Sequence, residues 1–424
     1  MSTFFMHTLA KHFIPDSSNL PARRYDLDWL RVIAFVFLIL FHCGMFYVEN
    51  WGWHVKSQYR SAFLENIMLI ISPWRMPLLW LISGIAMRFI MAKVTIWHFI
   101  SARTLRILLP LLFGILVVVP PQLYIEMTSN GDLNMSYWQF IRVFFSEDNL
   151  IFAKYQAGIW PHIDVNHLWF LRSLWQYSLI MLCILPLLNT SWVDKLSTHF
   201  FKLPAFFAIP LATLPLLIIE LNWQFSDVRY PLGFTFMLYG YLIGWQPSFW
   251  QRFRLHSNGL VLNFILAYIC VIYFYNQVWS IEKIAPGTNS PLLLLLGTTI
   301  YSLLSLLGVL ILFNFAYRCL NKNSSYLRYL NEAVYPFYIL HQTFIIVFGY
   351  SLSLLNLSAT LEASILVIVT FSACILSVEI IKRINLLRPC FGLKMRKSNN
   401  IVYQRIAYIS AVILIVPIAL EILI

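Results

Sequence analysis

The sequence has few charged residues. Only 11% of its 424 residues are Asp, Glu, Lys or Arg, whereas soluble domains average about a quarter. Hydrophobic residues make up 60% of the chain and aromatic residues 17%. So little charge excludes a soluble protein and indicates an integral membrane protein, in which many aromatic side chains lie at the lipid headgroup layers.

Several patterns that point to other functions are missing. The six cysteines lack the paired spacing of a zinc or iron–sulfur site, and no two of them lie on the predicted oxidising side, so we expect neither a metal centre nor a disulfide. Met1 to Pro21 lacks an apolar core with a small-residue cleavage site, so we expect no cleaved signal peptide. The net charge is +12, but a chain with so little water-exposed length cannot form the large basic surface that binds nucleic acid. We therefore expect no nucleic-acid partner.

Apolar runs of about 20 residues predict an all-α, polytopic bundle of transmembrane helices. A transmembrane β-barrel would instead show short alternating segments. We expect a cytoplasmic tail at 1–24, a ten-helix membrane core at 25–385, a basic cytoplasmic loop at 386–404 and an additional helix at 405–424. The predicted spans are 29–48, 66–92, 105–126, 168–189, 203–221, 232–250, 258–279, 292–319, 332–354, 361–383 and 405–424.

Lys and Arg gather in every second connection between these spans, for example at Arg103 and Arg106 and in the 386–404 loop. By the positive-inside rule those connections face the cytoplasm. The sequence therefore predicts a multi-pass protein of a cell membrane with a cytoplasmic N-terminus.

Ionisable residues inside a span are costly and are functional candidates by default. Arg31 and His42 of the first span are eleven residues apart, which places them on one helix face about 16 Å apart along the axis. That separation is comparable to the pantetheine arm of coenzyme A. A neutral imidazole at His42 could accept a hydroxyl proton. Alternatively, Arg31 snorkels and pairs with Asp28, and His42 bonds a neighbouring helix. Cys43 points about 100° away from His42, and we expect it to be packing filler.

The second span carries Arg75 between Pro73 and Pro77. Prolines leave backbone groups without helical partners, which a membrane tolerates only where protein or a water-filled cavity satisfies them. We therefore expect a broken helix here. Ser83 and Gly84 follow, and this small pair predicts a close approach of another helix.

Three further segments carry candidate residues. Arg103 and Arg106 lie three residues apart on one helix face and could bind phosphate, or they are ordinary positive-inside charge. His167 marks the start of the fourth span. His341, at mid-depth of the ninth, could orient substrate or share a proton, or it is one polar helix contact.

The connection at about 127–167 is the longest, and loops of this length are usually functional or disordered. It holds aromatic residues, including Trp160, among carboxylates. Such a mixture suits sugar recognition. The alternative is an amphipathic segment that lies in the membrane interface.

Together these blocks resemble membrane acyltransferase family 3, within it the branch of the glucans biosynthesis protein C-like acyltransferases, over about residues 24–385. The matching features are Asp28 and Arg31 followed by His42; Trp53-His54-Val55; Arg75-Met76 leading to Leu81-Ile82-Ser83-Gly84; Arg103-x-x-Arg106; His167-Leu168-Trp169-Phe170-Leu171; and Tyr338-x-Leu340-His341. Many members carry a Trp-Ser-Leu-Ser stretch where this chain has His167-Leu168-Trp169-Phe170, which favours the glucan-type branch.

The resemblance implies an enzyme of the bacterial inner membrane that moves an acetyl or succinyl group from cytoplasmic acyl-CoA to a carbohydrate hydroxyl at the outer face. No permanently bound cofactor is expected. The competing hypothesis is a transporter or glycolipid flippase. Transporters commonly show inverted repeats and paired broken helices, whereas this sequence shows one broken helix and no repeat. The assigned residues are His42 and His341 for catalysis; Arg31, Arg103, Arg106 and Asp28 for coenzyme A; and Arg75, His167, Trp169 and Trp160 for substrate.

Overall fold

The computed structural model describes residues 23–146, 150–155, 162–223, 227–244, 246, 249–250 and 257–396. Within these ranges the chain forms helices and loops, and Val48 and Ser61 form an isolated bridge. The all-α prediction is confirmed. The predicted additional helix at 405–424 lies outside the described residues.

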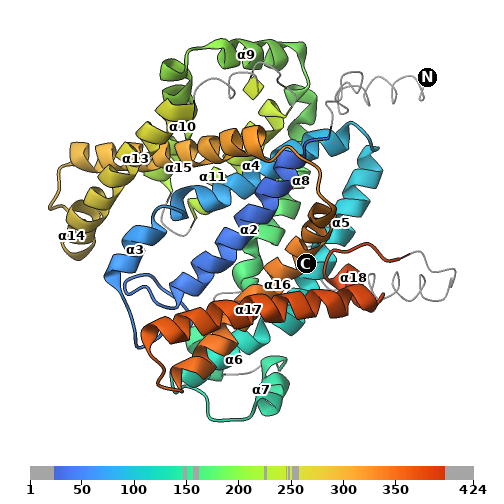
Figure 1. Cartoon of the computed structure of the whole chain (residues 1–424), viewed down its shortest axis with the longest axis vertical. Coiled ribbons are helices and arrows are strands. Elements are labelled where there is room, and N and C mark those ends of the chain that lie inside the picture. The colour runs from blue at the N-terminus through green and yellow to red at the C-terminus, as the bar shows by residue number, and fades with distance from the viewer. Residues whose placement is uncertain are drawn as a thin grey trace. The chain divides into compact units, whose positions relative to one another are not determined.

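The described part of the chain forms α-helices, which Figure 1 labels, and short helical segments of the 3₁₀ or π type (η). They are α2 (Tyr25–Met45), α3 (Ala62–Met68), α4 (Ser72–Met91), α5 (Ile96–Phe113), η1 (Gly114–Val118), α6 (Pro120–Ser129), α7 (Tyr137–Phe144), η2 (Leu150–Tyr155), η3 (Asn166–Leu168), α8 (Trp169–Leu188), α9 (Ser191–Lys202), α10 (Ala205–Asn222), α11 (Arg229–Ile243), α13 (Ser257–Tyr273), η4 (Phe274–Trp279), α14 (Ser280–Ile284), α15 (Pro291–Cys319), α16 (Ser325–Ser353), α17 (Ala359–Arg383) and α18 (Leu387–Cys390).

Nine helical segments in the described part of the chain are long and apolar enough to cross a membrane. The multi-pass prediction is therefore confirmed. The predicted span at 232–250 corresponds to α11, which has 15 residues and is too short to count among the nine. The nine segments are Tyr25–Met45, Ala62–Met91, Ile96–Ser129, Asn166–Leu188, Ala205–Asn222, Asn258–Ile284, Pro291–Cys319, Ser325–Ser353 and Ala359–Arg383.

The chain divides into two compact units, and five helices contribute residues to both: α2, α3, α5, α8 and α16. Unit 1 comprises Met1–Phe37, Asn66–Phe99 and Tyr177–Leu327, and unit 2 comprises Leu38–Glu65, Ile100–Gln176 and Arg328–Ile424.

In unit 1, α4 packs along α11, and α15 packs against α4, α10 and α13 (Figure 1). A Cβ atom added at Gly84 would lie 1.9 Å from the carbonyl oxygen of Met237, and one added at Gly240 would lie 2.0 Å from that of Leu81. Only glycine permits backbones to approach this closely. The close approach predicted at Gly84 is confirmed.

The second span is interrupted as predicted, but the interruption lies at residues 69–71, before the two prolines, and the helix runs unbroken through Arg75. Helix α3 ends at Met68 and α4 begins at Ser72. Pro73 lies in the first turn of α4, where its missing N–H leaves no helical bond unmade, whereas Pro77 lies inside the helix. The chain therefore restarts its helix just before Arg75.

In unit 2, the long connection after α6 forms the short helix α7, which lies beside α6 (Figure 1). Phe140 and Phe144 of α7 are buried against Phe152, and the ring of His162 stacks on Phe152 with centroids 3.9 Å apart. Trp138, on the other side of α7, is 76% exposed. Most aromatic residues described in this connection thus build a small hydrophobic core. Its contact with sugar or with lipid stays a prediction.

Candidate functional site

Two histidines from distant parts of the sequence meet in unit 2. His42 lies near the end of α2, and His341 lies within α16. Nδ1 of His42 is 2.7 Å from Nε2 of His341, and the two rings are nearly parallel, with 10° between their planes. His341 is fully buried and His42 is half-buried. A hydrogen bond therefore joins the two histidines that the sequence assigns to catalysis.

The backbone of α16 determines which nitrogens carry protons. Nδ1 of His341 lies 2.8 Å from the carbonyl oxygen of Tyr338 and 3.1 Å from that of Phe337. Because a carbonyl can only accept, Nδ1 of His341 carries the proton, and Nε2 of a neutral His341 is an acceptor. Nδ1 of His42 then donates to His341, and the lone pair of a neutral His42 is on Nε2. Such a lone pair is what a general base uses to accept a proton.

The loop at 46–61 covers the end of α2. The indole of Trp53 stacks on the ring of His42, with centroids 5.3 Å apart and 30° between the planes. Two residues earlier, Trp51 stacks on Phe41 at 5.9 Å. Two consecutive residues of α2, Phe41 and His42, thus each stack on a tryptophan of the same loop.

Polar contacts hold this loop in place. Nζ of Lys56 donates to the carbonyl oxygens of Met45 and Val48, both at 2.8 Å. The Met45 carbonyl lies at the C-terminal end of α2, where a helix favours positive charge, and the Val48 carbonyl lies three residues beyond it. Burial lowers the pKa of Lys56 to about 8. Oγ of Ser57 donates to the buried carboxylate of Glu362 at 2.7 Å. The loop is therefore held both by the end of α2, through Lys56, and by α17, through Ser57 and Glu362.

A pair formed by His54 and Glu126 lies beside the two histidines. Nδ1 of His54 bonds a carboxylate oxygen of Glu126, and the side-chain amide of Gln342 donates to Nε2 of His54 at 3.2 Å. This assignment places the proton of His54 on Nδ1, facing Glu126. His54 follows Trp53 in the chain, and Gln342 follows His341. The His54–Glu126 pair is therefore linked to the His42–His341 pair through neighbouring residues of the chain.

Buried amides extend this arrangement. Nε2 of Gln342 is 3.0 Å from Oδ1 of Asn166, and Nε2 of Gln122 is 2.7 Å from Oγ1 of Thr343. The Thr343 hydroxyl donates in turn to the carbonyl oxygen of Val118, at the end of the π-helical turn η1. Such turns occur often at functional sites, and a satisfied buried network fixes one packing arrangement.

His167 lies in the short helix η3, directly before Trp169, the first residue of α8. Nε2 of His167 is 2.9 Å from the carbonyl oxygen of Ile339, and the Tyr338 hydroxyl donates to the carbonyl oxygen of His167 at 2.5 Å. The amide of Gln122 lies 3.4 Å from Nδ1 of His167. His167 therefore braces the backbone of α16 beside His341, and a bond to substrate would have to replace one of these contacts. Trp169 is half-buried and begins α8.

Arg103 and Arg106 also belong to unit 2, on α5. Arg106 is exposed and Arg103 is half-buried. The Tyr335 hydroxyl of α16 donates to the carbonyl oxygen of Arg106 at 3.0 Å. The segment after α17 packs on the same tyrosine, because a Cβ atom at Gly392 would lie 2.5 Å from the Tyr335 ring. Two of the predicted coenzyme residues thus share a unit with the histidine pair.

The other assigned residues are placed elsewhere. Arg31, Asp28 and Arg75 lie in unit 1. Nη2 of Arg31 is 3.4 Å from Oδ1 of Asp28, so the ion pair considered as the alternative for Arg31 is present. The coenzyme role of this pair and the substrate role of Arg75 stay predictions. Trp160 lies outside the described residues.

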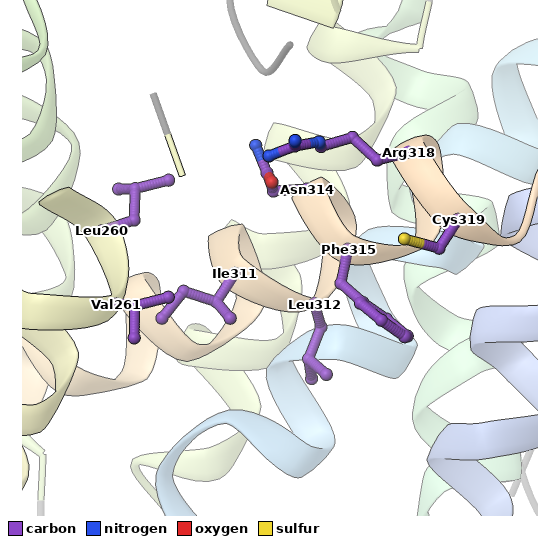
Figure 2. Close-up of a pocket in the computed structure, with 8 residues that line it drawn as sticks. All are labelled: Leu260, Val261, Ile311, Leu312, Asn314, Phe315, Arg318 and Cys319. Atoms are coloured by element: carbon purple, nitrogen blue, oxygen red, sulfur yellow. The ribbon is translucent and has the colours of Figure 1, made fainter. Parts of the chain in front are cut away.

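Figure 2 shows a pocket in unit 1, with a volume of about 330 Å³, that contains none of the assigned residues. Leu260 and Val261 of α13 and Ile311 of α15 give it a mainly apolar wall. Asn314 and Arg318 add polar groups toward the end of α15. An apolar wall on two membrane-crossing segments fits contact with lipid chains.

Five residues of this network were not predicted as site residues from the sequence: His54, Glu126, Gln122, Gln342 and Asn166. Glu126 falls inside the predicted third span, so the rule that singled out His42 also applies to it. The amides carry no charge and gave no comparable signal.

Comparison with known proteins agrees with these observations. A family model described as an acyltransferase domain matches residues 24–379. Glucans biosynthesis protein C of Salmonella typhi is 25% identical over 364 residues, covering 78% of this chain and 85% of that protein, and the protein of the same name from Salmonella typhimurium gives the same values. No solved structure gives a significant match. Because the family match covers nearly all of the described helices, the chain belongs to this acyltransferase family and is a membrane acyltransferase that transfers groups other than amino-acyl groups.

Proposed function

We propose that this enzyme moves an acetyl or succinyl group from acyl-CoA to a carbohydrate hydroxyl, with His42 as the general base. The observation that carries the proposal is the 2.7 Å contact between His42 and His341, in which the Tyr338 carbonyl orients His341. The name of the relatives suggests a glucan as the acceptor. Membership of an acyltransferase family favours bond formation over the transport alternative.

The reaction that we propose is direct transfer. The acceptor hydroxyl oxygen attacks the thioester carbonyl carbon while its proton moves to Nε2 of His42. The carbon–sulfur bond then breaks, and the same proton passes from His42 to the sulfur, which gives an ester and free coenzyme A. His341 keeps accepting from Nδ1 of His42 and acts as a positioning residue. No protein nucleophile takes part, so the buried thiol of Cys43 is not required.

The coenzyme would lie along the run formed by α5, η1 and α6. Guanidinium forks at Arg103 and Arg106 suit phosphate groups. Sixteen residues separate Arg106 from Gln122, which corresponds to about 24 Å along a helix. An arginine side chain and an extended pantetheine arm together have this reach. The phosphates would then lie at one end of the run and the thioester near the amide network.

We further propose an inner-membrane location with a cytoplasmic N-terminus, so that the arginine end receives acyl-CoA and the His54 end meets the acceptor. The support is the distribution of Lys and Arg among the connections. Cysteines introduced at Ser136 and Asn399, in a background without the native cysteines, should react with an impermeant reagent from opposite sides. Labelling of both positions in intact cells would contradict this topology.

The direct test uses purified protein, acetyl-CoA or succinyl-CoA, and a glucan oligosaccharide. His42→Ala should bind coenzyme A nearly normally yet lose about 10²- to 10⁴-fold in transfer rate, because a general base acts mainly in the transition state. Replacing Arg103 and Arg106 together by Gln should weaken coenzyme A binding at least about tenfold, and less for pantetheine thioesters. Wild-type transfer by His42→Ala, or equal coenzyme A affinity in the arginine variant, would overturn these roles.

A further inference from the structure

We propose that Trp53 shields His42 from water and thereby determines that the acyl group goes to the acceptor hydroxyl. The inference rests on the acyl transfer proposed above and adds a residue that controls its outcome. The indole lies on the ring of His42, with centroids 5.3 Å apart.

A base that activates a sugar hydroxyl can also activate water. In that side reaction, a water oxygen attacks the thioester carbonyl, the carbon–sulfur bond breaks, and the products are a free carboxylic acid and coenzyme A. The proton balance is the same as in transfer, so His42 itself does not discriminate between the two hydroxyl compounds. Discrimination has to come from the surroundings that exclude water from the base. Trp53 is the aromatic side chain that the loop at 46–61 places on His42.

The next residue holds the indole in position. His54 bonds Glu126 through Nδ1 and receives the amide of Gln342 at Nε2, so both ring nitrogens have protein partners. The rings of Trp53 and His54 also meet at an angle of 67°, with centroids 5.5 Å apart. Lys56 ties the same stretch to the end of α2. The shield is therefore part of a fixed loop.

An acceptor can nevertheless displace the Trp53 indole from the ring of His42 while the loop stays in place. The indole N–H of Trp53 is buried and has no hydrogen-bond partner among the residues that the structure describes. An unsatisfied buried donor weakens the closed arrangement. A sugar offers an apolar ring face for stacking and hydroxyl oxygens that accept from an indole N–H. Acceptor binding can thus compensate for the lost contact between Trp53 and His42, whereas water offers no ring face.

The loop contains a matched control. Trp51 lies two residues before Trp53 and stacks on Phe41, the neighbour of His42, at a similar distance. If the two tryptophans serve only to pack the loop on α2, their removal should have similar effects. If Trp53 shields the base, only its removal should increase hydrolysis.

The experiment measures two products from acetyl-CoA or succinyl-CoA with purified full-length protein: coenzyme A released without acceptor, and acylated glucan oligosaccharide formed with it. Trp53→Ala should raise the ratio of hydrolysis to transfer by about tenfold, the factor expected from losing one aromatic stacking contact. Trp53→Phe keeps a ring on His42 but lacks the indole N–H that donates to the acceptor, so its ratio should rise less than that of Trp53→Ala. Trp51→Ala should stay near wild type. Glu126→Gln loosens the hold on His54 and should raise the ratio by a smaller factor.

Each outcome decides the matter. Normal wild-type transfer with the same ratio in Trp53→Ala and Trp51→Ala would overturn the shielding role and leave the proposed function intact. A ratio in Trp53→Phe as high as in Trp53→Ala would also contradict it. If Trp53→Ala is not recovered folded, an unchanged ratio in Glu126→Gln overturns the proposal. Absence of transfer by the wild type would overturn the proposed function, and the shielding role with it.

Discussion

The bond between His42 and His341 predicts a specific response to substitution at position 341. Nε2 of His341 lies 2.7 Å from Nδ1 of His42 and serves as its acceptor. Gln and Met side chains have similar lengths, but only Gln ends in an oxygen that can accept a hydrogen bond. His341→Gln should therefore keep an acceptor for His42, and His341→Met should remove it.

The size of the effect follows from the burial of this contact. His341 is fully buried, and loss of one partner of a buried hydrogen bond costs about 1–3 kcal/mol. In the wild type, this bond persists while His42 takes up the acceptor proton. Its loss in His341→Met therefore raises the activation barrier of transfer by the same free energy, which lowers kcat by about 5- to 150-fold. His341→Gln should recover most of that loss. KM for acyl-CoA should stay the same in both variants, because His341 acts through His42.

The assay is steady-state transfer with purified variants, with kcat and KM determined separately and thermal unfolding in the same detergent measured alongside. His199→Met is a suitable control, since His199 is exposed on α9 in unit 1 and its Nδ1 bonds a carbonyl of its own helix. Wild-type kcat in His341→Met would refute the positioning role. Equal losses of kcat in the Gln and Met variants, with equal losses of thermal stability, would reduce His341 to a packing contact between helices.

Three further outcomes are expected. Burial lowers the pKa of Lys56 from 10.5 to about 8. Between these two pH values the unfolded chain binds the Lys56 proton more tightly than the folded chain does, so thermal stability should rise with pH from about 8 to 10.5. The rise should be smaller in Lys56→Met. Gly84→Ala places a Cβ atom 1.9 Å from the carbonyl oxygen of Met237 and should lower stability by roughly 1–3 kcal/mol in thermal unfolding, whereas Gly259→Ala, with nothing within 4 Å, should not. Cys43→Ala should retain transfer, and mass spectrometry should find no acyl adduct on Cys43 in the wild type.

Much of the fold could be predicted because its signals are local. A run of apolar residues long enough to cross a membrane specifies a helix wherever the neighbouring helices lie. The break before α4 follows from Pro73, and the close contact at Gly84 follows from its missing side chain. His42 and His341 were predicted for the same kind of reason, since an ionisable residue in an apolar run is costly by itself.

The contacts that assemble the candidate site could not be predicted in this way. His42 and His341 are 299 residues apart in the chain, and His54 and Glu126 are 72 apart. Hydropathy assigns each residue to a helix or loop but contains no term for which helices become neighbours. The proton arrangement of the pair also depends on the Tyr338 carbonyl, a backbone group that every residue possesses. Only the structure brings these groups within hydrogen-bond distance.

The two groups around His42 act on different parts of its ring. His341 accepts from Nδ1, an edge of the ring, whereas the Trp53 indole covers a face. The edge contact determines which nitrogen holds the lone pair, so it governs how fast a proton can be taken up. The face contact determines which molecules reach the ring, so it governs which hydroxyl compound supplies the proton. Substitution at position 341 should therefore change the rate of transfer with little change in its products, and substitution at position 53 should change the products.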